Sequence, residues 1–97
     1  MKLIVVEATL DPQDREGAIA LFQGQADAVR GMEGCDSYGI FASPAHAGDI
    51  VIVQRWASLE AFDAYKASDV FARLGQGLRP LMSAPPATTI ADVSDGY

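Results

Sequence analysis

The chain has 97 residues, with 13 acidic and 7 basic side chains, and its formal net charge is −6 at pH 7. Because nucleic acids and anionic membranes attract basic surfaces, this balance argues against both classes of partner. The length predicts a single domain, and no apolar run approaches the roughly 20 residues that cross a bilayer.

The first half of the chain predicts a strand, a helix and a second strand. Residues 3–10 form an apolar strand that carries one carboxylate, Glu7. Asp11-Pro12 is typical of a helix start, and Gly31 is the expected residue just beyond the helix end. Four residues form the apolar face of this helix: Ile19, Phe22, Ala26 and Val29. A second strand follows over residues 35–42.

The second half predicts a hairpin, two further helices and a last strand. Residues 43–48 are rich in turn formers, so the strands on either side should pair as a hairpin. The strand over 49–56 contains four consecutive β-branched residues, which suit a strand buried on both sides. Ser58 and Ser68 are the expected N-caps of two helices. A short strand over 88–93 follows, and residues 94–97 form a tail.

The order of these elements, β-α-β-β-α-β, is that of the ferredoxin-like α+β fold. Helices on one side of a four-stranded sheet leave the other side open. Because the first and third strands are apolar on both sides, we expect an exposed apolar face that includes Ile4, Val6, Val51 and Val53. A second copy packed sheet to sheet would cover it, so the sequence predicts a homodimer.

Three segments resemble a known family: Met32-Glu-Gly-Cys-Asp-Ser-Tyr38, Arg55-Trp-Ala-Ser-Leu-Glu-Ala-Phe62 and Ser68-Asp-Val-Phe71. From about residue 2 to 93, the core of the single domain 1–97, the chain resembles the antibiotic biosynthesis monooxygenase domain. The segment around Cys35 is similar to quinol monooxygenases. Members of the family form dimeric α+β barrels, and they include oxygenases of polycyclic phenols and quinols that need no cofactor, and haem-degrading enzymes.

The resemblance implies an oxidoreductase that oxidises a small quinol, polyphenol or polyketide-type aromatic with dioxygen and without metal or flavin. A deprotonated substrate of this kind reduces dioxygen itself. The protein then supplies a dry pocket, a proton acceptor and dipoles that stabilise the anion. The alternative is a non-catalytic dimeric barrel that binds a small apolar ligand or has a structural role.

The candidate site lies on the sheet face that, by the resemblance, looks toward the helices. We expect Glu7, Ile52, Gln54 and Trp56 to share that face. The candidate catalytic residues are Glu7, Trp56 and Tyr65, and the candidate substrate-binding residues are Tyr38, Ile52, Gln54 and Phe62. A buried Glu7 would have a raised pKa and could act as the base. Its alternative is a structural pairing, for example with Arg55, and the aromatic residues have the alternative of simple core packing.

Family members differ from this chain at several of these positions. Polyketide-oxidising members have a Tyr and an Asn where this chain has Phe62 and Ile52, whereas Trp56 matches. Haem-degrading members have an Asn, a Trp and an axial His where this chain has Glu7, Tyr65 and Gly75. Because glycine cannot ligate iron, we expect no haem. We also expect no other cofactor and no metal.

Other chemistries have weaker signals. His46, the single histidine, lies in a turn-rich segment, whereas zinc and iron sites need clustered ligands. Cys35 is expected to be a strand residue rather than a nucleophile, since no histidine accompanies it. Its lack of a disulfide partner, together with an amino-terminal apolar run too short for a signal peptide, predicts a cytoplasmic protein.

Overall fold

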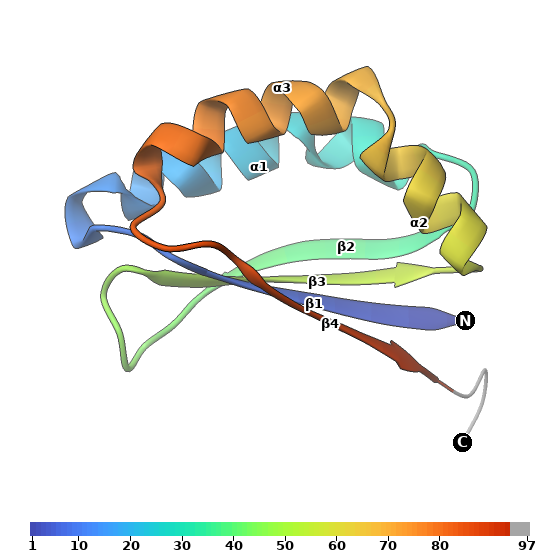
Figure 1. Ribbon diagram of the computed structural model, residues 1–97, viewed down its shortest axis with the longest axis horizontal. Helices are drawn as coiled ribbons and strands as arrows, with labels where there is room; N and C mark the ends of the chain where they lie inside the picture. Colours follow the sequence, from blue (N-terminus) through green and yellow to red (C-terminus); the bar gives the residue numbers. More distant parts are fainter. Residues whose placement is uncertain (94–97) are drawn as a thin grey trace.

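Four antiparallel strands form one layer and the helices form a second layer on one side of it (Figure 1). The structure is a computed structural model that describes residues 1–93; the expected tail over 94–97 lies outside these residues. The strands are β1 (Lys2–Thr9), β2 (Cys35–Ala42), β3 (Asp49–Trp56) and β4 (Ala87–Asp92). The α-helices are α1 (Arg15–Arg30), α2 (Leu59–Lys66) and α3 (Asp69–Leu78), with short 3-10 turns at Pro12–Asp14 and Arg79–Leu81.

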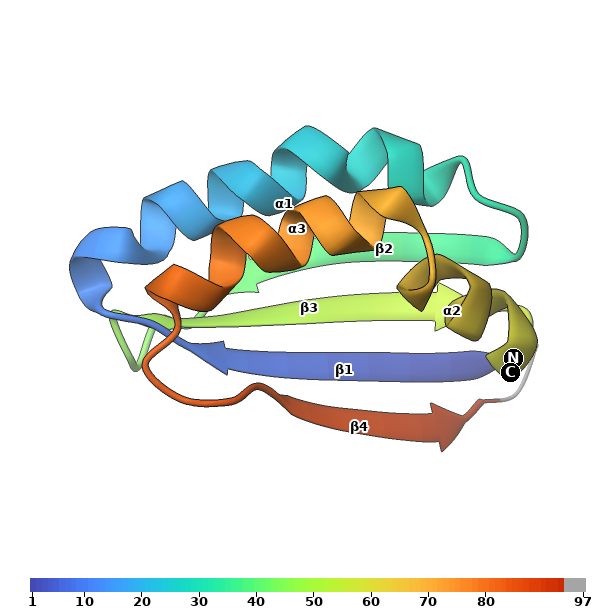
Figure 2. The same ribbon diagram turned by 45° about the horizontal axis from the view of Figure 1, so that its top comes forward.

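The strand order is β2-β3-β1-β4, with each neighbouring pair antiparallel. This order and the succession of elements confirm the ferredoxin-like α+β fold predicted from the sequence. Figure 2 shows α1 lying over β2 and α3 lying beside α1. Within residues 1–93, no helix is both long and apolar enough to cross a membrane.

The register decides which side chains face the helices. Residues directly opposite each other in an antiparallel pair point to the same side of the sheet. Gln54 is opposite Ile4 on β1 and opposite Tyr38 on β2, and all three are buried under the helices. On the far side, which we call the open face, the apolar side chains larger than alanine are Leu3, Val5, Phe41, Val51 and Val53.

The expected composition of the open face was therefore half wrong. Val51 and Val53 lie on it, as predicted, but Ile4 and Val6 point toward the helices. The physical reason is the register: Ile4 and Val6 are opposite Gln54 and Ile52, so they share the helix side with these two residues and not the side of Val51 and Val53. The open face nevertheless keeps an exposed aromatic residue, because Phe41 is 58% exposed.

Serine caps start two of the helices, as the sequence predicted. The Ser58 Oγ atom accepts a hydrogen bond from the backbone N–H of Ala61 (3.2 Å), and Ser68 Oγ accepts one from that of Phe71 (3.2 Å). The first helix begins differently: Asp11 makes no side-chain cap, and a 3-10 turn precedes α1. Helical N–H groups that Ser58 and Ser68 satisfy are otherwise unpaired, so these caps fix where α2 and α3 start.

Candidate active site

A cavity of about 430 Å³ lies between the sheet and helices α2 and α3. It exists because α1 packs on β2 and β3, whereas α3 packs mainly on α1 and leaves the space over β1 and β4 unfilled. Most of its lining residues are apolar: Val6, Ala8, Leu10, Phe22, Ile50, Ile52, Phe62, Phe71, Leu74, Leu78, Met82, Pro86 and Ile90. Its volume falls within the range of roughly 300–1,000 Å³ that is usual for small-molecule sites.

Gln54 is the buried polar residue of the cavity wall, with 4% of its surface exposed. Its Oε1 atom accepts a hydrogen bond from the indole Nε1–H of Trp56 at 3.0 Å. An indole nitrogen can only donate, so it must face the amide oxygen and not the amide nitrogen. This contact leaves the Gln54 NH₂ group free to donate hydrogen bonds to a ligand.

Aromatic rings pack behind and beside Gln54. The Trp56 ring is fully buried and stacks on that of Tyr65, with centroids 5.2 Å apart and an angle of 19° between the planes. Tyr38 meets Tyr65 edge-on at 6.3 Å. Offset stacked and edge-on rings are favourable contacts, so this cluster holds the indole, and through it the Gln54 amide, in one position.

Burial raises the pKa of both phenols in this cluster, and for Tyr38 the neighbouring Tyr65 phenol raises the pKa further. Both groups are therefore neutral at physiological pH. The Tyr38 hydroxyl is enclosed by protein beside the Tyr65 phenol, and no group within residues 1–93 meets it in good hydrogen-bond geometry. Tyr65 lines the cavity, whereas Tyr38 lies outside it.

Comparison with known proteins identifies the family. The sequence model of the family described as antibiotic biosynthesis monooxygenase matches residues 1–76, which are 76 of the 97 residues. The chain belongs to the antibiotic biosynthesis monooxygenase family. The resemblance seen in the sequence is thereby confirmed over most of the chain.

Two relatives illustrate the likeness. The candidate monooxygenase Rv0793 of Mycobacterium tuberculosis is 28% identical over 79 residues, which cover 81% of this chain and 77% of the relative. Its solved structure has a TM-score of 0.88 at 23% identity, covering 98% of this chain and 96% of that one. A candidate antibiotic biosynthesis monooxygenase from Caulobacter crescentus has a TM-score of 0.91 at 21% identity, covering 97% and 90% of the two chains. At these identities the structural likeness shows a shared fold.

Four of the seven predicted site residues of this family member lie together in the cavity wall: Ile52, Gln54, Phe62 and Tyr65. Two others support the wall from behind. Trp56 does not line the cavity but contacts both Gln54 and Tyr65, and Tyr38 packs against Tyr65. We therefore treat Trp56 and Tyr38 as residues that position the wall.

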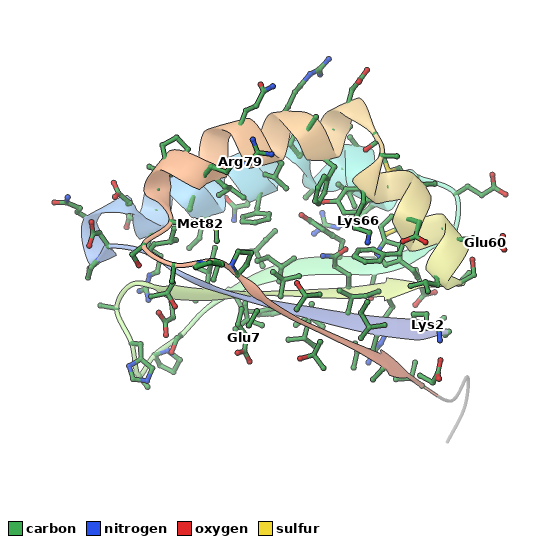
Figure 3. All side chains as sticks on the ribbon, in the orientation of Figure 1. Lys2, Glu7, Glu60, Lys66, Arg79 and Met82 are labelled. Carbon is green, nitrogen blue, oxygen red and sulfur yellow. The ribbon has the colours of Figure 1, made fainter. Side chains whose placement is uncertain are left out.

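Glu7 is the exception, and its expected position was wrong. It is opposite Val51 on β3, so it lies on the open face and not with Ile52, Gln54 and Trp56. The side chain is exposed, and Figure 3 shows it on the side of the sheet away from the helices. The odd-numbered positions of β1 point to the open face. A carboxylate there cannot reach a ligand in the cavity.

Two basic residues of the cavity, Lys66 and Arg79, were missed by sequence reasoning. Both are exposed and line the cavity, so they lie at its rim (Figure 3). A signal was present, since Lys66 lies one turn after Phe62 and Arg79 lies one turn after Gly75, and all four line the cavity. This spacing could not be interpreted without knowing which side of each helix faces the sheet.

His46 and Cys35 take positions that do not join the site. His46 is exposed in the β2–β3 connection, where its backbone carbonyl accepts from the N–H of Asp49. Cys35 is partly buried at the start of β2, and burial raises the pKa of its thiol, which disfavours the reactive thiolate. Among residues 1–93, no three His, Cys, Asp or Glu side chains are grouped as a metal site.

Proposed function

We propose that this protein is a monooxygenase that oxidises a small quinol or polyphenolic aromatic with dioxygen and without a cofactor. The observation that carries the proposal is the apolar cavity with one oriented amide donor in its wall, the Gln54 NH₂ group. Membership of the antibiotic biosynthesis monooxygenase family supports the reaction class. The substrate class is our inference from the cavity's size and lining.

The reaction needs no outside reductant. A phenolate gives one electron to dioxygen, and the resulting phenoxyl radical and superoxide combine at a ring carbon that carries hydrogen. That carbon then loses its proton as the O–O bond breaks, so one oxygen atom stays as a carbonyl and the other leaves as water. The apolar walls exclude bulk water, and the Gln54 N–H groups donate to the phenolate oxygen.

Deprotonation of the substrate follows a route other than the one expected from the sequence. With Glu7 on the open face, the described lining of the cavity contains no carboxylate and no histidine. We infer that the substrate binds as its anion or ionises on binding, helped by the amide donor. The rate of oxygen uptake should then rise with pH until the bound phenol is fully ionised.

The proposal includes a homodimer formed through the open face and a cytoplasmic location. The dimer is supported by the apolar side chains Val51 and Val53, together with the exposed Phe41. Burying such a face removes apolar surface from water, which stabilises association. The location is supported by the single cysteine, which has no partner in the chain.

Oxygen consumption by metal-free, flavin-free protein with dihydroxynaphthalenes and related quinols tests the proposal. We expect uptake of one dioxygen per quinone formed. Gln54→Leu should lower kcat by about a hundredfold, since it removes the donor to the anion. Gln23→Leu, the same change on the exposed side of α1, should have no effect.

Two results would contradict the proposal: no uptake with any quinol, or equal rates for the two variants. Binding of a naphthalene ligand without oxygen uptake would favour the non-catalytic ligand-binding alternative. That alternative has one specific observation in its favour, namely the lack of a carboxylate or histidine among the described lining residues.

A further inference from the structure

The rim of the cavity has a charge opposite to that of the whole chain. The protein carries 13 acidic and 7 basic residues. Two of those basic residues, Lys66 and Arg79, line the cavity, whereas none of the acidic residues within 1–93 does. An arbitrary patch of this protein would hold more carboxylates than cations. The cavity therefore combines an apolar interior with a cationic rim.

Lys66 is held at the rim by Phe62. The Lys66 ammonium lies 4.8 Å from the centroid of the Phe62 ring, and that ring lines the cavity. Its ionic contact is with Asp63, one turn earlier on α2, at 3.3 Å. The two side chains are 44% and 59% exposed, so water screens this pair and leaves it weak. The ammonium can exchange Asp63 for an anion in the cavity.

Arg79 lies back over the last turn of α3. A Cβ atom built on Gly75 would stand 3.3 Å from Arg79 Nη2. Because Gly75 has no side chain, the guanidinium can lie against the backbone of α3 at the cavity wall. Arg15 and Arg30 donate to backbone carbonyls, and Lys2 pairs with Asp92. Among the described residues, no carboxylate pairs with Arg79.

We propose that this site is selective for an aromatic substrate that carries a carboxylate, with the rings inside the cavity and the carboxylate at its rim, where Lys66 and Arg79 supply the positive charge. The planar guanidinium of Arg79 can bind a carboxylate through two N–H groups, and the ammonium of Lys66 attracts a carboxylate as a point charge. Gln54 then remains for the phenolic oxygen. The inference rests on the proposed function only in naming the bound molecule as a substrate.

Charge selectivity can be measured by binding, without oxygen chemistry. Isothermal titration calorimetry should compare 2-naphthoate with 2-naphthamide, which has nearly the same shape and no charge. We expect the wild-type protein to bind 2-naphthoate about tenfold more tightly than 2-naphthamide, as for a hydrogen bond to a charged group. Lys66→Met and Arg79→Met should each lower this preference, and the double variant should remove it. Lys66→Arg should keep it.

The matched control is Arg73→Met, which removes the same charge from an exposed position on α3 outside the cavity. It should leave the preference unchanged. Equal affinity for the two ligands, no binding of either, or the same loss of preference in Arg73→Met would overturn the inference. Neither ligand has a phenolic hydroxyl to oxidise. Failure of oxygen uptake with the preference intact would therefore count against the monooxygenase alone.

Discussion

Gln54 and Trp56 act together at the level of single residues. The alternation along β3 predicted that Ile52, Gln54 and Trp56 share one side of the sheet, and they do. The sequence could not predict that the indole lies behind Gln54 instead of in the cavity. That arrangement depends on α2, which places Tyr65 against the indole ring.

Replacing Trp56 by Phe should release the Gln54 amide. We expect kcat for oxygen uptake to fall by about tenfold, because a freely turning amide offers a less ordered donor to the anion. The pH of half-maximal kcat should also move upward, since a weaker donor stabilises the bound phenolate less. Steady-state oxygen-electrode assays over a pH series measure both effects.

The control for this variant is Val29→Ala, which also truncates a fully buried side chain, but in α1 and outside the cavity lining. It should lower thermal stability without moving the pH profile. An unchanged profile in Trp56→Phe would contradict the positioning role of the indole.

The unpaired hydroxyl of Tyr38 gives a prediction about stability. Tyr38→Phe should raise the free energy of unfolding by about 1 kcal/mol at pH 7, because it removes an enclosed polar group that has no well-aligned hydrogen-bond partner within residues 1–93. Burial raises the pKa of Tyr38 in the folded protein, so above the ordinary tyrosine pKa of about 10 the unfolded chain loses a proton that the folded protein keeps. Wild-type stability should therefore fall as pH rises above that value.

The decline should be less steep in Tyr38→Phe and least steep in the double variant Tyr38→Phe, Tyr65→Phe. Urea unfolding at pH 7 and at about pH 10.5 measures this difference. A loss of stability at pH 7 in Tyr38→Phe would show that the hydroxyl has a favourable partner.

Glu7 shows where reasoning from single residues fails. A carboxylate in an apolar strand is a reasonable candidate for a catalytic base. The side of the sheet on which it lies, however, is set by the pairing of β1 with β3. The register of pairing decides whether the odd- or the even-numbered residues of a strand face the helices. A shift of one residue exchanges the two sides. Both sides of β1 are largely apolar, so the sequence pattern gave no way to choose between them.

At the level of elements, the sequence was a good guide because local signals mark the ends. The strands over 35–42 and 49–56 have the predicted bounds, and β1 and β4 differ from prediction by one residue at each end. The carboxyl-terminal end of α1 was less predictable. Its C-cap Gly31 has a right-handed conformation, with φ −80°, and the positive φ of 85° falls at Gly34 instead.

Gly34 should be intolerant of a side chain for two reasons. Its φ of 85° is unfavourable for other residues, and an added Cβ would stand 2.5 Å from the Ala61 Cβ of α2. We expect Gly34→Ala to lower the free energy of unfolding by about 2–4 kcal/mol. Chemical denaturation followed by circular dichroism measures the change.

Gly24→Ala is the matched control, because this α1 residue is exposed and a Cβ there meets nothing within 4 Å. It should raise the free energy of unfolding by about 0.5–1 kcal/mol, the difference in helix preference between the two residues. Wild-type stability in Gly34→Ala, or the same gain in stability at both positions, would contradict the role assigned to Gly34.

At the level of the whole molecule, the sheet exposes apolar surface on one side while helices cover the other. Sequence reasoning reached the two-layer architecture through the order of elements. It placed a pocket on the helix side of the sheet but could not predict its position over β1 and β4, because that space arises from α3 packing mainly on α1. Such distances between layers depend on side-chain fit along the whole interface.

If the open face is a dimer interface, a charge at its centre should dissociate the dimer. We expect the wild-type protein to sediment at about twice the 10.3 kDa chain mass, and Val53→Asp at the chain mass, because burying a carboxylate against an apolar face is unfavourable. Analytical ultracentrifugation at micromolar concentration measures this. Ala72→Asp, on an exposed position of α3, should remain dimeric. A monomeric wild-type protein would refute the interface.

β4 is one of the two edge strands of the sheet, and its exposure affects how molecules reach the interior. Every residue from Ala87 to Asp92 is exposed, and within the protomer the strand hydrogen-bonds to β1 along one edge, beside the cavity residues Thr88 and Ile90. Such a strand is the segment that detaches at the lowest free energy while its neighbours stay in place. Its brief separation would admit an aromatic guest through the side wall, so β4 amides should take up deuterium first, and more slowly once a guest is inside.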